Sequence, residues 1–156
     1  MKHLLTLLTL TTLTHAGPPT EAPAGWERKL VAAVIIAEAG GEGRIGMKAV
    51  YEVIWTRGVD RKRSLSAVVT RRKQFSCLNR TTPAALVRRM SQHSQYEWVH
   101  DTLLKFPPLT MHTVPAHLLE LAPNRANHYH AANVRPYWAK GQRSRTIGNH
   151  KFYKLK

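Results

Sequence analysis

Two stretches of apolar side chains at helical spacing open the ordered part of the chain. The first predicts a well-buried helix over residues 26–39, ended by Gly40 and Gly41; its apolar positions are Trp26, Leu30, Val31, Val34 and Ile35. The second predicts a helix over residues 45–57, with Gly58 just past its end; its apolar positions are Met47, Val50, Val53 and Ile54.

Shorter helices are predicted farther along the chain. They lie at residues 65–71, 83–90, 95–106 and 115–121. Thr82 is a predicted N-cap, and Pro83 takes the first helical position, where its missing N–H costs nothing. Pro107 and Pro108 end the amphipathic segment before them.

Two short segments near the C-terminus alternate between aromatic and polar residues. Residues 127–134 and 149–154 have this pattern, which predicts two strands of a small sheet. The expected fold class is therefore α+β, mostly helical, with a small antiparallel sheet in a single domain over residues 26–156.

The N-terminal residues have the features of an export signal. Lys2 precedes the apolar run 4–13, and small residues follow at 14–16, which predicts a signal peptide over residues 1–16 and a Pro-rich flexible leader over residues 17–25. An uncleaved anchor is the alternative, but the run is shorter than the roughly 20 residues of a membrane-spanning helix. We expect an exported protein, in the periplasm, cell wall or medium, without stable membrane insertion.

Charge and cysteine content limit the kinds of molecule that the protein is expected to bind and the role expected of its cysteine. The chain has 24 Lys and Arg against 9 Asp and Glu, so loss of Lys2 with the signal leaves a net charge of about +14. Such a field attracts any polyanion, and export favours wall or membrane over nucleic acid. Cys77 is the single cysteine and forms no intramolecular disulfide; a small buried hydrophobe is favoured over a nucleophile.

Few carboxylates are available as general acids. Glu38 follows the apolar run 31–37 in the last turn of a predicted helix, where the peptide dipoles favour a protonated carboxyl. It is a candidate proton donor, and an ordinary glutamate at a frayed helix end is the alternative. A two-carboxylate hydrolase would also need Glu42, which the glycine turn allows into the same cleft, or Glu52, which is more typical of a salt-bridged surface group.

Histidines and aromatic residues cluster in the predicted strands. His128 and His130 would share one face and reach a metal, but no third ligand has a recognisable spacing, so hydrogen bonding in a polar groove is favoured, with no metal or cofactor. Tyr129, Trp138 and His150 are candidates for a sugar-binding groove. Phe152 is expected in the core.

Four blocks of residues resemble, in order, the cell wall hydrolases of the SleB and CwlJ type. They lie at 36–43 (Ile-Ala-Glu-Ala-Gly-Gly-Glu-Gly), 46–54, 74–77 (Gln-Phe-Ser-Cys) and 128–153. The resemblance implies a fold related to lysozymes and lytic transglycosylases, with Glu38 as the catalytic acid. The chain departs from the family pattern at Gly40, usually arginine, and at Thr56, usually asparagine.

With this resemblance, one acid suggests a lytic transglycosylase that cleaves glycan strands between N-acetylmuramic acid and N-acetylglucosamine. The expected substrate-binding residues are Glu42, Gln74, Ser76, Tyr129, His130, Trp138 and His150. Hydrolysis with Glu42 positioning water is a close alternative. Others are a zinc-dependent amidase and a non-catalytic cationic module that binds wall or nucleic acid. We expect a monomer that binds peptidoglycan and no nucleic acid.

Overall fold

Two long helices form the centre of the computed structural model, which describes residues 23–105 and 126–156. They are α1 (Gly25–Ala39) and α2 (Gly43–Arg61). Every residue of α1 from Leu30 to Ile36 is buried, because α2, α3, α4 and the helical segment near Val99 all pack against it. The predicted helix over residues 26–39 is therefore confirmed, with Glu38 in its last turn.

The junction between the two long helices is a single 3₁₀ turn, Gly40–Glu42. Gly43 follows it with φ +67° and starts α2. Our prediction that α2 ends at residue 57 was wrong, because Gly58 is a buried helical residue. The helix ends instead where Lys62 adopts φ 50°, and the N–H of Arg63 then bonds to the Gly58 carbonyl at 2.9 Å.

Two short helices pack against α1, and both start at side-chain caps, of which only Thr82 was predicted. The Ser64 hydroxyl accepts from the Ala67 N–H before α3 (Leu65–Thr70), and the Thr82 hydroxyl accepts from the Ala85 N–H before α4 (Pro83–Met90). Pro83 takes the first position of α4, as predicted. Helix α3 ends one residue before the predicted end.

The segment predicted as a helix over residues 95–106 is helical but irregular. It consists of a π-helical turn, Trp98–Thr102, followed by a 3₁₀ turn, Leu103–Lys105. The Leu103 N–H bonds to the carbonyls of both Trp98 and Val99, which widens the turn. Residues 1–22 and 106–125 lie outside the described part, so the predicted signal peptide, most of the leader, the proline stop and the 115–121 helix fall there.

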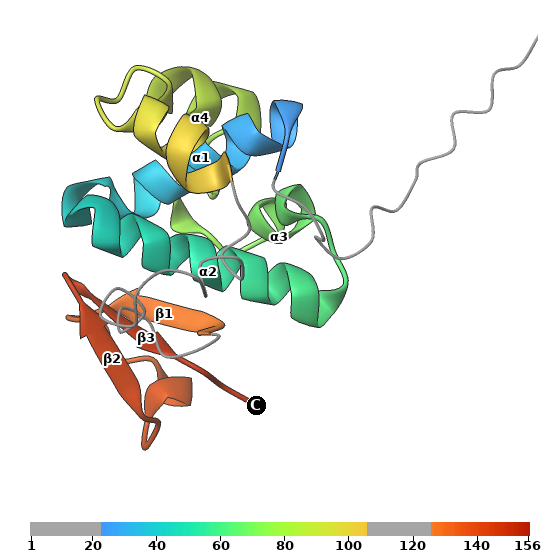
Figure 1. Ribbon diagram of the computed structural model, residues 1–156. Coiled ribbons are helices and arrows are strands. Elements are labelled where there is room, and N and C mark those ends of the chain that lie inside the picture. The colour runs from blue at the N-terminus through green and yellow to red at the C-terminus, as the bar shows by residue number, and fades with distance from the viewer. Residues whose placement is uncertain (1–22, 106–125) are drawn as a thin grey trace, which may run out of the picture.

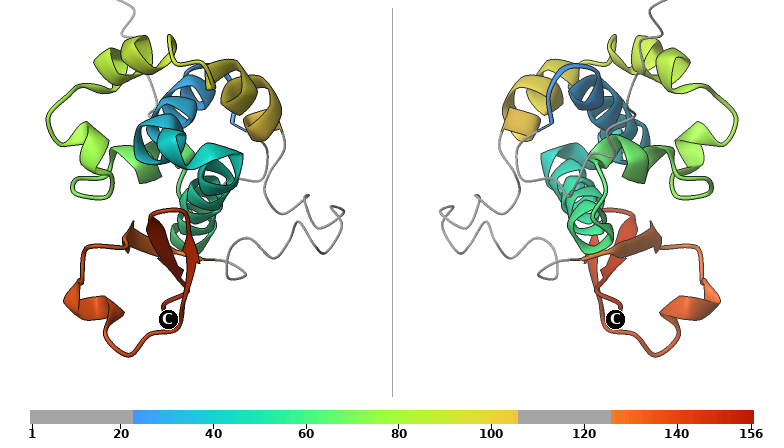
Figure 2. Two further views of the ribbon diagram at one scale, coloured as in Figure 1. Left: turned by 90° about the vertical axis from the view of Figure 1, so that its left-hand side faces the viewer. Right: turned by 90° about the vertical axis from the view of Figure 1, so that its right-hand side faces the viewer.

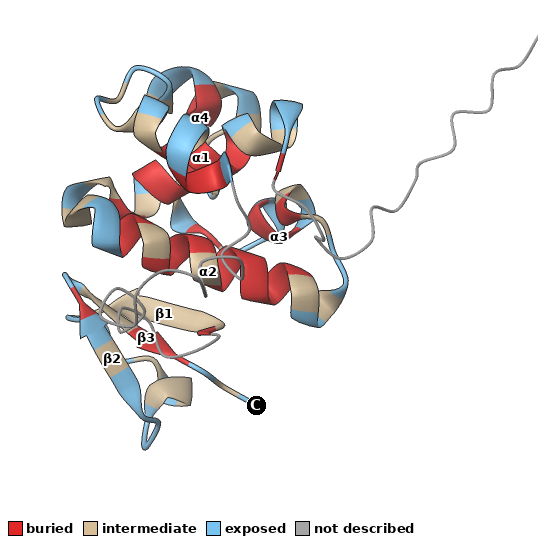
Figure 3. Ribbon diagram, in the orientation of Figure 1, coloured by how far each residue is buried: buried red, intermediate tan, exposed pale blue. Residues whose placement is uncertain are grey.

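A three-stranded antiparallel sheet packs below α2, opposite α1 and α4 (Figures 1 and 2). Its strands are β1 (His128–Ala131), β2 (Ser144–Ile147) and β3 (His150–Tyr153), in the order β1-β3-β2. Both predicted strands exist. The third, β2, was not predicted, because its exposed side chains lack an apolar alternation and only Ile147 is buried (Figure 3).

The core extends from the helices into the sheet. Phe152 is fully buried, as predicted, and Tyr153 and Ile147 are buried beside it. The architecture confirms a mostly helical α+β domain with a small sheet. No helix within the described ranges is both long and apolar enough to cross a bilayer.

Candidate active site

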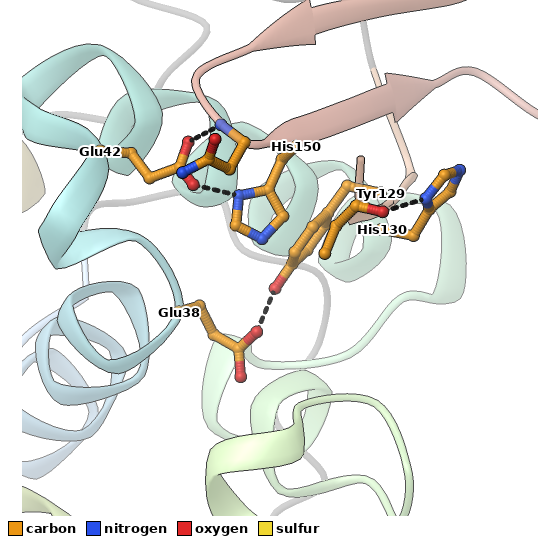
Figure 4. Close-up of polar contacts among 7 residues, drawn as sticks. Glu38, Glu42, Tyr129, His130 and His150 are labelled. Carbon is orange, nitrogen blue, oxygen red and sulfur yellow. Dashed lines mark hydrogen bonds and ion pairs between the residues drawn. The ribbon is translucent and has the colours of Figure 1, made fainter. Parts of the chain in front are cut away.

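Glu38 lies where α1, the segment around Ser76 and strand β1 meet. Its Oε2 accepts a 2.9 Å hydrogen bond from the Tyr129 hydroxyl (Figure 4). Its Oε1 accepts two longer ones, each of 3.3 Å, from the Ser76 hydroxyl and the Cys77 backbone N–H. The carboxylate is half-buried and fixed at one oxygen, while the other oxygen has only long contacts that a substrate can replace.

Two ring contacts hold the Tyr129 side chain in place beside Glu38. Its ring stacks on Phe152 at 5.5 Å and meets His150 edge-on at 5.4 Å. Burial, followed by the charge of Glu38, raises the pKa of Tyr129 well above its ordinary value. The phenol therefore keeps its proton and acts as a permanent donor to Glu38.

Glu42 is bound to the turn between β2 and β3 (Figure 4). Its Oε2 accepts from the Asn149 N–H at 2.8 Å, and its Oε1 lies 2.9 Å from Nδ1 of His150. The Glu42 side chain is only 7% exposed, and the His150 side chain is 14% exposed. Gly148, with φ +54°, makes this approach possible, since a Cβ there would meet the Glu42 carboxylate. Both oxygens of Glu42 are thus engaged with the sheet.

This contact also fixes which nitrogen of His150 faces Glu42. A carboxylate only accepts hydrogen bonds, so Nδ1 of His150 is the donor, and Nε2 is an acceptor when the ring carries one proton. Figure 4 shows the His150 ring between Glu42 and the Tyr129–Glu38 pair. Glu42 therefore orients His150 toward the space in front of Glu38.

Arg57 is a buried cation beside Tyr129 and Glu38, and it was not among the residues predicted for the site. Its Nε donates to the Asn127 carbonyl at 2.7 Å, and its guanidinium lies 5.6 Å from the centre of the Phe75 ring. Burial lowers the pKa of Arg57 to about 10, and the charge of Glu38 acts in the opposite direction. The group stays positive at neutral pH. The sequence did indicate that Arg57 is buried, because this residue falls on the apolar face of its helix.

The segment from Gln74 to Cys77 supplies the opposite side of the site. Ser76 contacts Glu38, whereas the Gln74 side chain accepts a 3.2 Å hydrogen bond from Arg61. Burial, then the charge of Glu38, raises the pKa of Cys77 to about 12. The thiol is therefore protonated at neutral pH, which agrees with a packing role.

His128, His130 and Trp138 form one aromatic cluster on the face of the sheet opposite Tyr129, so the structure does not bring His130 and Trp138, both predicted for the substrate groove, to Glu38. The two imidazoles lie 5.2 and 5.5 Å from the Trp138 ring, respectively. His130 donates through Nδ1 to the Ala131 carbonyl, and its Nε2 lies 2.8 Å from the Tyr153 hydroxyl. Across the residues that the structure describes, no three His, Cys, Asp or Glu side chains group as metal ligands.

Glu52 is the remaining carboxylate that sequence reasoning considered. It is half-buried on α2 rather than on an open surface. Burial raises the pKa of Glu52 from 4.5 to about 7, with Lys48 lowering it in part. Within the described ranges it forms no ion pair, so the expected salt-bridged surface group is not what the structure has.

Comparison with known proteins identifies the family. The model of a family described as Cell Wall Hydrolase matches residues 41–153, more than half of the chain. The match includes Glu42, Tyr129 and His150, and it starts three residues after Glu38. Searches of curated proteins and of solved structures found no significant match. The family match supports an enzyme that acts on peptidoglycan, and the chain belongs to the cell wall hydrolase family.

Proposed function

We propose that this protein is a lytic transglycosylase that cleaves the glycan strand between N-acetylmuramic acid and N-acetylglucosamine, with Glu38 as its acid and base. The observation that supports this most is the Glu38 carboxylate itself. It has a fixed donor, Tyr129, on one oxygen and an exchangeable oxygen facing Ser76. A carboxyl held in this way can give up and take back a proton at its exchangeable oxygen.

In the first step, Glu38 carries the proton on the oxygen that contacts Ser76 and Cys77. It gives this proton to the glycosidic oxygen as the bond from that oxygen to C1 of the muramic residue breaks. Positive charge develops on the muramic ring. The Glu38 carboxylate formed in this step is stabilised by the hydrogen bond from Tyr129 and by the nearby charge of Arg57.

In the second step, the muramic C6 hydroxyl attacks C1, and its proton passes to Glu38. The products are a 1,6-anhydromuramic end and a free 4-hydroxyl on the glucosamine, and no water is consumed. His150, held by Glu42, offers Nε2 as an acceptor to a sugar hydroxyl in front of Glu38. Trp138 packs against His128 and His130 on the sheet face opposite Tyr129, so we assign it no part in this step.

Hydrolysis would instead need a second carboxylate to position water. Glu42 was our candidate, but its oxygens already accept from Asn149 and His150. We therefore assign Glu42 to orienting His150. The products distinguish the two reactions: mass spectrometry of fragments from purified peptidoglycan should find anhydro ends, lighter by one water than reducing ends. A population of reducing ends alone would show hydrolysis.

We also propose that the enzyme reaches its substrate by export, with residues 1–16 removed as a signal peptide. The family acts on a wall that lies outside the cytoplasm. Secreted protein should start at Gly17 when its N-terminus is sequenced. Intact Met1 on the protein from the wall fraction would contradict cleavage.

A further inference from the structure

Two basic hollows border helix α3 and the turn that follows it. The first has a volume of about 510 Å³ and is lined by Arg61, Arg63, Ala67, Val68 and Arg71. The second, of about 440 Å³, is lined by Arg71, Arg72, Lys73, Phe75, Leu78 and Asn79, among others. Arg71 borders both. Each hollow thus combines several cations with a small apolar floor.

Several cations converge on the first hollow. Burial and then the charge of Arg71 lower the pKa of Arg61, and Asp60 offsets this only in part. Like charges that converge in a hollow favour a bound anion, and guanidinium groups suit the two oxygens of a carboxylate.

The hollows adjoin the active site through the chain itself. Phe75 and Leu78, which line the second hollow, flank the two residues that bond to Glu38. From Lys73 to Ser76 the chain spans at most about 10 Å. On the sheet side, Arg61 is close enough to strand β1 to influence His128. An anion in the hollows therefore lies near the bond that Glu38 would cleave.

We propose that these hollows bind carboxylates of the peptide stem carried by the muramic residue at Glu38. This inference rests on the proposed function and names the form of its substrate. The stem leaves the muramic ring at the lactyl group, within one sugar of the scissile bond, and four extended residues reach about 13 Å. A stem of that length can extend from a muramic ring near Ser76 to the hollows. Ala67 and Leu78, which line the hollows and are not fully buried, offer apolar contacts for the methyl groups of alanine residues.

The test compares two substrates and two variants. Glycan strands with peptide stems are compared with the same strands after an amidase has removed the stems. Native enzyme should have a kcat/KM about tenfold higher for the peptide-bearing strands. Arg63→Gln with Arg71→Gln, both at exposed positions, should bring this ratio close to one by slowing only the peptide-bearing strands. Lys29→Gln with Arg143→Gln, also exposed and outside the hollows, should leave the ratio unchanged.

A binding measurement distinguishes failure of this inference from failure of the proposed function. Free tetrapeptide stem, titrated into the Glu38→Gln protein, should bind and lose affinity in the Arg63/Arg71 variant. A ratio unaffected by the Arg63/Arg71 changes, or a poly(glycerol phosphate) that binds there while the tetrapeptide does not, overturns the inference. Cleavage of neither substrate by native enzyme, with tetrapeptide binding intact, overturns the glycan-cleaving function and leaves the stem site standing.

Discussion

Tyr129 and Glu38, 91 positions apart in the chain, are joined by a 2.9 Å hydrogen bond in which the phenol is the donor. The contact links the sheet to the end of α1. Because Phe152 and His150 fix the ring, the bond requires no reorganisation when the carboxylate forms.

Replacing Tyr129 by phenylalanine removes this donor and preserves the stacking on Phe152. We expect kcat to fall about tenfold to hundredfold, as for loss of one fixed donor, with a small change in melting temperature. Steady-state kinetics on soluble glycan strands would measure this. Unchanged kcat would show that the phenol does not stabilise the reacting carboxylate.

Glu42→Gln tests whether the second glutamate positions His150 or a water. The amide keeps an acceptor for the Asn149 N–H but loses the charged contact to His150. We expect a moderate fall in rate and anhydro products throughout. A loss as deep as that of Glu38→Gln, with reducing-end products from the native enzyme, would instead make Glu42 part of a hydrolytic mechanism.

Glu52 should make stability depend on pH. Its pKa is 4.5 before folding and about 7 afterwards, so the folded state holds the proton more tightly. The resulting stability is complete below pH 4.5 and is lost as the pH rises through 7, by about 3 kcal/mol at most. Urea denaturation at pH 5 and pH 8 should show this loss in the native protein and a smaller one in Glu52→Gln. Equal pH slopes for both proteins would exclude Glu52 as the cause.

Binding to the wall should depend steeply on salt. The basic clusters 61–63, 71–73 and 88–89 act over distances that salt screens, with a Debye length of about 10 Å at 0.1 M and about 3 Å at 1 M. Sedimentation with purified sacculi should show a large loss of binding over this range. Cleavage of a short uncharged glycan should change much less. Binding that stays flat up to 1 M salt would leave these clusters with no role beyond solvation.

Some helices and strands could be predicted from the sequence, and others could not. Helix α4 was predictable because Thr82 and Pro83 act locally. The end of α2 was not, because Gly58 is compatible with both a stop and a buried helical turn, and only the Lys62 conformation decides. Strand β2 lacks an apolar pattern, since its side chains stay exposed and it depends on pairing with β3.

Sequence nominated residues for the site but not their contacts. Glu38 and Tyr129 were both candidates, and their hydrogen bond depends on how the sheet packs against α2. Glu42 was expected in the cleft, yet Gly148 allows the β2–β3 turn to bind it. Arg57 was missed because a charge among apolar helix positions predicts burial without naming its partner.

The central claim is that Glu38 transfers the proton, and the most direct measurement is the rate at which Glu38→Gln releases soluble fragments from purified sacculi. The change is isosteric, so melting temperature should stay close to that of the native protein, and Glu52→Gln serves as a matched control for loss of one carboxylate. We predict a rate at least about a hundredfold lower for Glu38→Gln. A variant that folds normally and keeps more than about a tenth of the native rate would contradict the role of Glu38 as the general acid.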